Sequence, residues 1–273
     1  MEFLSLPPVR RALIAVLVSG VAFPLSGVLV LEMNLITLRF ALMHGALLGG
    51  AIAVAAGIHP LAPTIAVGAI MVIAIGRISR KTGQNPGLIT TMFMTASVAA
   101  AAVIVYRFNV PAKDTLALIW GNVYALRPVD LMVTIAVAAV IVGVIVGFRR
   151  QIVAVLYDPE VAFIAGVNEP LIYYAVLGIV ALTVAVAMRL VGALLLDVFI
   201  LLPALAARQI ARSGAQLFLY ASAIGLVSGV VGFSASLTLD IPVSTATAAP
   251  ALIFIGIAAV IRTRRKSSQR IRS

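Results

Sequence analysis

Residues 189–212 read RLVGALLLDVFILLPALAARQIAR, which has the apolar density of a membrane span but places Asp197 in its middle. A carboxylate at bilayer depth costs at least about 2.5–3.5 kcal/mol, so it normally faces a cavity or a partner. Pro203 removes one backbone donor and clashes with the carbonyl of Phe199, which predicts a helix break there. The stretch is typical of the wall of a transport pathway. The alternative is a kinked packing helix in which Asp197 pairs with a polar neighbour.

The composition indicates a polytopic membrane protein. Of 273 residues, 63% are hydrophobic and 11% are charged, whereas a soluble domain carries roughly 25% charged residues. The absence of cysteine excludes disulfides, thiolate nucleophiles and Cys-based metal sites. The net charge of +11 comes from basic residues at span ends and in the tail, a pattern that sets membrane topology and does not indicate nucleic-acid binding.

Apolar runs predict an all-α transmembrane bundle with eight or nine spans, one of them broken. The predicted spans are 12–31, 40–58, 61–76, 88–105, 128–148, 171–188, 190–207, 215–239 and 241–261. The count falls to eight if 190–207 re-enters without crossing. We expect a single membrane domain over 1–273, with the bundle at 12–261, a cytoplasmic loop at 149–170 and a basic tail at 262–273.

The positions of lysine and arginine orient the chain. With 149–170 in the cytoplasm and the spans alternating, most of the 20 basic residues fall on the inside. This favours a multi-pass protein of the cell membrane with a cytoplasmic C-terminus. Arg10 and Arg11 oppose an outside N-terminus, and an interfacial N-terminal helix would account for them.

The loop at 149–170 contains a short helix signal. Asp158 can cap a helix, while Pro159 and Glu160 suit its first turn. Gly166 suits a left-handed stop, and Phe163 lies in an apolar run before it. A helix this short is not stable alone, so we expect it to dock onto another surface.

Here the sequence resembles a known family. YDPEVAFIAGV (157–167) resembles the coupling-helix motif of permease subunits of zinc/manganese-type metal ABC transporters. The segments LALIWGNVYALRPVDL, RLVGALLLDVFILLPALAAR, FALMHGALLGGAIA and SLTLDIPVSTA are similar to further motifs of that family. The matches run in order from about residue 24 to 255 and together are fairly specific.

The resemblance implies a permease of an ATP-driven importer for zinc, manganese or a similar divalent ion. It implies an ABC ATPase in the cytoplasm, an external metal-binding lipoprotein, and a second permease copy or paralogue. It assigns coupling to the ATPase to Asp158, Pro159, Glu160, Phe163 and Gly166. No cofactor is expected in this chain, and none of its lysines lies in a P-loop, so a partner would hydrolyse the ATP.

Two departures from the family concern the cargo. The family's second span usually opens Gly-Asp-x-x-x-His, whereas this chain has Arg39 and Phe40 before His44. Asp197 stands where the family more often has a small or apolar residue. One hypothesis is a metal site shared by His44 and Asp197, since imidazole and carboxylate both suit zinc. The competing hypothesis is an Arg39–Asp197 ion pair, in which case the cavity would be structural or specific for another cargo. The shared site requires that the second span start before residue 40 and that Arg39 snorkel.

Two other function classes fit the residues less well. A secondary carrier would use Asp197 to bind a proton, but no inverted repeat is evident. A membrane enzyme would need a second catalytic group beside His44 or Asp197, and the sequence offers none.

Overall fold

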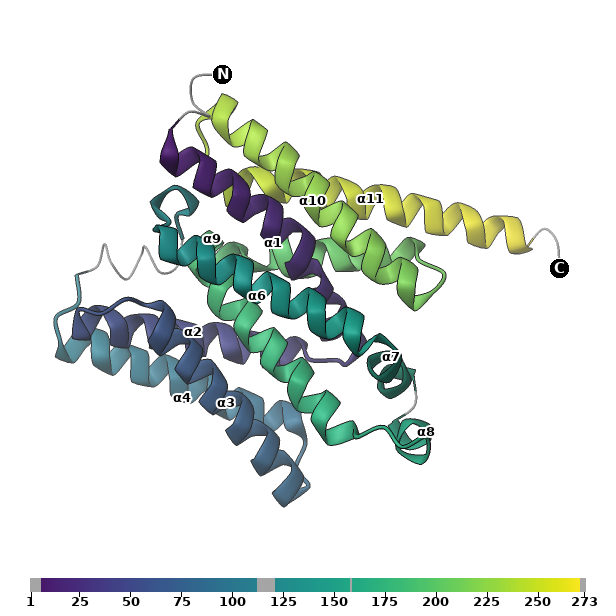
Figure 1. Cartoon of the computed structure of the whole chain (residues 1–273), viewed down its shortest axis with the longest axis horizontal. Coiled ribbons are helices and arrows are strands. Elements are labelled where there is room, and N and C mark those ends of the chain that lie inside the picture. The colour runs from purple at the N-terminus through teal and green to yellow at the C-terminus, as the bar shows by residue number, and fades with distance from the viewer. Residues whose placement is uncertain (1–5, 112–120, 158, 271–273) are drawn as a thin grey trace. The chain divides into compact units, whose positions relative to one another are not determined.

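The computed structural model describes residues 6–111, 121–157 and 159–270, without the side chains of 157, 159–161, 193–195 and 265–270. All regular elements in these ranges are helices, which confirms the predicted all-α fold (Figure 1). They are α1 (Pro7–Glu32), α2 (Ile36–Ala56), α3 (Leu61–Thr82), α4 (Pro86–Arg107), the 3-10 turn η2 (Val123–Ala125), α6 (Pro128–Gly147), α7 (Arg149–Tyr157), α8 (Pro159–Ile164), α9 (Glu169–Ile210), α10 (Gly214–Leu239) and α11 (Val243–Arg270).

Eight helical segments in the described residues are long and apolar enough to cross a membrane. They are α1, α2, α3, α4, α6, α10, the first part of α9 (Glu169–Gly192) and most of α11 (Val243–Arg264). The predicted segment 190–207 falls mainly in the second part of α9, so a ninth crossing stays a prediction. Helix α11 continues into the basic tail that was predicted from residue 262.

The helices divide into two compact units that interleave along the chain. Unit 1 comprises Met1–Leu31, Tyr124–Val142 and Asp197–Ser273, and unit 2 comprises Glu32–Val123 and Gly143–Leu196. The division falls inside α9, so that its first part belongs to unit 2 and its last part to unit 1.

In unit 2, α2 packs on both α3 and α4. A Cβ atom at Gly49 would lie 2.5 Å from the Cα of Thr64, so glycine allows the backbones of α2 and α3 to approach closely. Ser97 of α4 donates a hydrogen bond to the sulfur of Met71 in α3, at 3.6 Å. Tight turns connect these helices, and the Asn85 side chain caps α4 by accepting from the Gly87 amide at 2.8 Å.

In unit 1, α1 and α10 cross at a glycine contact. A Cβ atom at Gly20 would lie 3.0 Å from the carbonyl oxygen of Gly225, and one at Gly225 would overlap Gly20 and Pro24. Beside this crossing, Ser222 donates a hydrogen bond to the Val21 carbonyl at 2.7 Å. Within this unit α1, α6 and α11 run in one direction, while α10 runs in the opposite one (Figure 1). Small residues therefore set the spacing of an up-and-down bundle.

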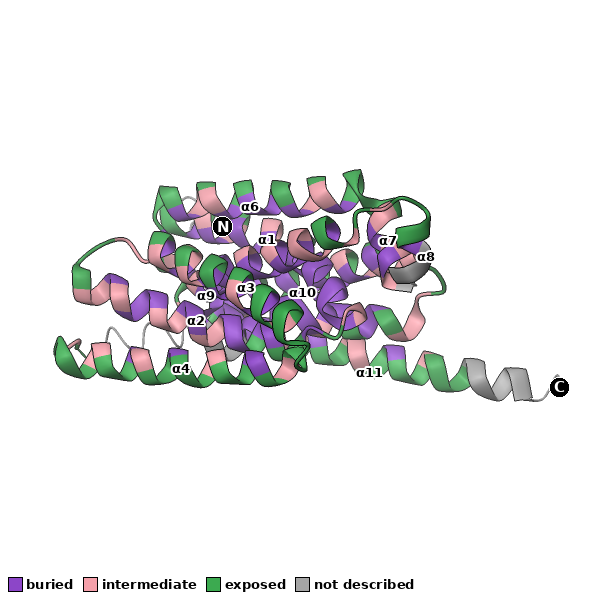
Figure 2. Cartoon of the chain, turned by 90° about the horizontal axis from the view of Figure 1, so that it is seen from below, coloured by how far each residue is buried: buried purple, intermediate pink, exposed green. Residues whose placement is uncertain are grey.

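Apolar side chains remain exposed on the outer faces of both units. Figure 2 shows long exposed stripes on α4 and α11, whereas α1 is largely buried. Examples on α4 are Met92 and Val103. Exposed apolar faces on helices with satisfied backbones are expected where lipid replaces water.

Helix α9 corrects one prediction. Its non-helical residue is Gly192, with φ 78° and ψ 171°, whereas Pro203 lies buried within helical backbone. The expected break at Pro203 is therefore wrong in position. Glycine adopts this conformation without a steric penalty, and a proline inside a membrane helix is tolerated where neighbouring groups cover its backbone. Gly27 of α1 supplies such cover, because it packs directly on the Ile200 carbonyl and beside Ala204.

Candidate functional site

His44 lies on α2 in unit 2 and is half-buried. Its Nδ1 is 2.7 Å from the carbonyl oxygen of Phe40, one turn earlier in the helix. Because a carbonyl can only accept, Nδ1 carries the hydrogen in the neutral ring and Nε2 keeps its lone pair. Metal-binding histidines commonly have this arrangement, in which a backbone carbonyl fixes the tautomer. His44 is thus set up to offer Nε2 to a cation.

Arg39 lies near the start of the same helix. Helix α2 begins at Ile36, so the second span starts before residue 40, as the shared metal site requires. Arg39 does not snorkel, however, because its side chain is fully buried, so the second condition for that site is not met. Its guanidinium lies 4.1 Å from the centroid of the Phe40 ring, a cation–π contact. A buried cation therefore stands close in sequence to His44.

Asp197 lies in unit 1, near the start of the last part of α9, and is half-buried. Phe199, two residues after Asp197, lies close to Gly229 of α10 and Val16 of α1. A Cβ atom added to Gly229 would be 3.9 Å from the Phe199 ring and 3.1 Å from the Val16 side chain. Val16 and Gly229 are in the middle of α1 and α10, which places Asp197 near mid-depth of unit 1. His44 belongs to the other unit, so a site shared by His44 and Asp197 stays a prediction. Among the described residues, no three His, Asp or Glu side chains gather into a metal-binding group.

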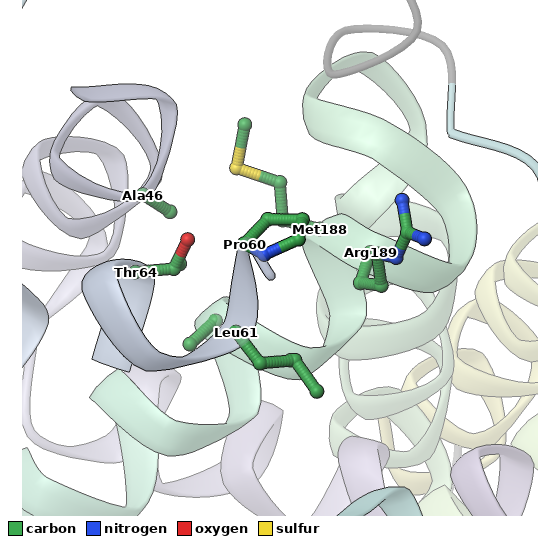
Figure 3. A pocket seen from close by; sticks show the side chains of 7 residues that line it. Ala46, Pro60, Leu61, Thr64, Met188 and Arg189 are labelled. Atoms are coloured by element: carbon green, nitrogen blue, oxygen red, sulfur yellow. The ribbon is translucent and has the colours of Figure 1, made fainter. Parts of the chain in front are cut away.

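A pocket in unit 2 lies between the start of α3 and the end of the first part of α9 (Figure 3). Its volume is about 350 Å³ including its open mouth. The lining residues are Ala46, Pro60, Leu61, Thr64, Ala185, Met188 and Arg189. This lining contains a guanidinium and no carboxylate or imidazole, so it is unsuited to a bare divalent cation.

Two glycines meet beside this pocket. A Cβ atom at Gly121 would overlap the amide nitrogen of Gly192 and lie 2.9 Å from its Cα. Gly121 also has a positive φ, 65°. Gly192 adopts a φ/ψ combination that is essentially restricted to glycine. Gly192 was not predicted as the break, although it lies in RLVGALLLDVFILLPALAAR, one of the segments that carried the resemblance.

The predicted coupling segment forms a helix. After α7, helix α8 runs Pro159–Ile164, and α7 and α8 pack together. Ala162 is buried, whereas Phe163 and Ile164 are 72% and 83% exposed. The amides of Gly166 and Val167 donate to the carbonyls of Phe163 and Ala162, both at 3.0 Å, and Gly166 has φ 78°. The left-handed stop at Gly166 is thereby confirmed.

The other coupling residues are less defined. Asp158 lies outside the described residues, and Pro159 and Glu160 lie in α8 with side chains that the structure does not describe. Their predicted roles therefore stay predictions. Pro159 is the first residue of α8, the position at which a proline is favoured.

Comparison with known proteins gives a consistent result. The family model described as "ABC 3 transport family" matches residues 5–262. The chain is 23% identical to the manganese transport system membrane protein MntC of Halalkalibacterium halodurans, over 88% of this chain and 82% of that protein. It is 23% identical to the high-affinity zinc uptake system membrane protein ZnuB of Haemophilus influenzae, over 84% of this chain and 87% of that protein.

A solved structure shares the fold. It is PsaBC from Streptococcus pneumoniae in complex with Fab, with a TM-score of 0.82 and 20% identity over 94% of this chain and 93% of that one. The predicted resemblance is thus confirmed, and with it the prediction of a transport protein rather than an enzyme.

Proposed function

The chain belongs to the ABC 3 transport family, and from that membership we propose that it is the permease subunit of an ATP-driven importer of manganese or zinc. The relatives named for manganese and zinc transport support this cargo class. As a multi-pass permease of a bacterial transporter family, the chain resides in the plasma membrane. We propose that the metal ion is cargo and that this chain holds no resident cofactor.

The observation that carries this proposal is the exposed apolar end of α8. Among the described residues outside the predicted spans, Phe163 and Ile164 are the most exposed neighbouring apolar pair, and they lie on a helix too short to be stable alone. Exposed apolar side chains on a short helix between the predicted spans are suited to contact with a protein partner. Its partner, we infer, is a cytoplasmic ABC ATPase, and the other proposed partners are an external metal-binding protein and a second copy of this permease.

The proposed orientation places α8 and the C-terminus in the cytoplasm. Within unit 1, α6 and α11 run in the same direction, so both helices lead toward one side of that unit (Figure 1). Arg149 and Arg150 follow α6, and Arg262 and Arg264 lie near the end of α11. Basic residues on one side favour that side as the cytoplasmic one.

For the cargo site, we propose that His44 and Asp197 are ligands of the passing ion. The Nδ1–Phe40 hydrogen bond of His44 and the mid-depth position of Asp197 in unit 1 support this role. If Arg39 instead pairs with Asp197, Asp197→Asn would leave a buried cation without its charge partner and cost about 3–5 kcal/mol. In that case Arg39→Gln in the same chain should restore the stability, as measured by thermal unfolding in detergent.

The test of the function is complex formation with the ATPase. The chain is co-expressed with a candidate ABC ATPase partner, and the complex is isolated in mild detergent. Phe163→Ser with Ile164→Ser should abolish co-purification and leave the unfolding temperature of the permease unchanged, because both side chains are exposed. Leu219→Ser, at an exposed site on α10, is the matched control. An ATPase that binds the double variant as tightly as the wild type would refute the assignment.

A further inference from the structure

The C-terminal end of α3 and the N-terminal end of α9 meet in a cluster around Arg80. Nη2 of Arg80 lies 3.3 Å from both carboxylate oxygens of Glu169. Its guanidinium also lies 5.4 Å from the ring centroids of Tyr173 and Tyr174. An ion pair this exposed is weak by itself, but the two cation–π contacts add to it. The cluster therefore joins the last turn of α3 to the first turns of α9.

The contact between α3 and α9 continues along their length. One turn above Arg80, the ring of Tyr174 lies so close to Gly76 that a Cβ atom there would be 2.6 Å from Cε1. Near the middle, a Cβ atom at Gly68 would lie 3.7 Å from the Cβ of Ala181. At the far end, Thr64 and Met188 line one pocket (Figure 3). The two helices are in contact at both ends and in the middle.

The cluster directly follows α8 in the chain. Hydrogen bonds from Gly166 and Val167 close the end of α8, and the Asn168 side chain accepts from the Leu171 amide at 3.1 Å, which caps the start of α9. The link between α8 and Glu169 is thus short and internally bonded. A displacement of α8 would be passed to Glu169 with little loss.

We propose that α3 and the first part of α9 move as one body during transport, and that Arg80 is the positioning residue that passes the motion of α8 to α3. This inference rests on the proposed function, because it assumes that an ATPase displaces α8. A consequence of this proposal is that the pocket lined by Thr64 and Met188 moves together with the Arg80 cluster, since both lie on the same helix pair.

The first experiment uses the absence of cysteine from the chain. Gly68→Cys with Ala181→Cys places two Cβ atoms about 3.7 Å apart, within the range of a disulfide. We expect the disulfide to form on oxidation and ATP-driven metal uptake to continue unchanged. Uptake that stops on oxidation and returns with reductant would show that α3 and α9 slide, and failure of the disulfide to form would show that the contact is absent. Either result overturns the proposal.

The second experiment tests Arg80. Arg80→Gln should lower the metal taken up per ATP hydrolysed severalfold, and Arg80→Lys should restore only part of it, because lysine keeps the charge but not the guanidinium contacts with Glu169 and the two rings. The matched control is Arg77→Gln, since Arg77 is exposed on the same helix and has no ion pair or ring contact among the described residues. If the Arg80→Gln and Arg77→Gln variants take up equal amounts of metal per ATP hydrolysed, the proposed role of Arg80 is overturned. A wild-type complex without ATP-driven uptake would instead count against the proposed function.

Discussion

Replacement of Gly192 by alanine tests the break in α9 most sharply. The backbone there has φ 78° and ψ 171°, a conformation that costs a residue with a side chain about 1–3 kcal/mol. Alanine also restricts the unfolded chain, which offsets about 0.4–1 kcal/mol of that strain. The net loss of stability should lie between about 0 and about 2.6 kcal/mol, with a central value of about 1.3 kcal/mol, which is roughly a tenfold change in the ratio of folded to unfolded protein.

The matched control is Gly178→Ala in the same helix. Gly178 has helical backbone, and a Cβ atom there would meet no atom within 4 Å. Alanine should therefore stabilise by about 0.5–1 kcal/mol. The assay is thermal unfolding of both variants in the same detergent, where each kcal/mol corresponds to about 2–4 °C in chains of this size. If Gly192→Ala unfolds at the same temperature as Gly178→Ala, α9 is not broken at Gly192 and the reasoning fails.

Two further predictions concern the packing of unit 1. Gly225→Ala should destabilise the protein by about 1–3 kcal/mol, because the new Cβ atom would overlap Gly20 and Pro24. The control is Gly256→Ala in α11, which faces open space and should not destabilise the protein. Equal unfolding temperatures of the two variants would contradict the α1–α10 crossing. Tyr124→Phe should cost about 0.5–1.5 kcal/mol, because it removes the hydroxyl 3.2 Å from Ser236 but keeps the ring 6.3 Å from Phe233; a Tyr124→Phe variant as stable as the wild type would show that this hydrogen bond contributes nothing.

Much of the fold follows from local sequence. Apolar runs of bilayer length predict helices whatever their neighbours are, since an unsatisfied backbone is not tolerated in lipid. The short helix near Pro159 and its stop at Gly166 follow from capping preferences, which are also local. These parts needed no knowledge of packing.

The break in α9 required tertiary context. Proline is the stronger helix breaker in isolation, so the sequence pointed to Pro203. In the folded chain, Gly27 covers the backbone before Pro203, while Gly121 packs on Gly192, and both contacts join residues far apart in sequence. The full burial of Arg39 could not be predicted from the sequence either, because a charged residue near the end of a span is normally expected to snorkel.

The most direct measurement is uptake of radioactive manganese and zinc by proteoliposomes that contain the permease and its ATPase, with metal-loaded binding protein outside. We expect uptake that requires ATP, that persists when the pH gradient is collapsed, and that His44→Ala and Asp197→Asn each abolish. The double variant should be no worse than either single one, because ligands of one ion act as a unit. Uptake that follows the pH gradient without ATP would contradict the importer, and ATP-driven uptake unchanged in both variants would contradict the cargo site.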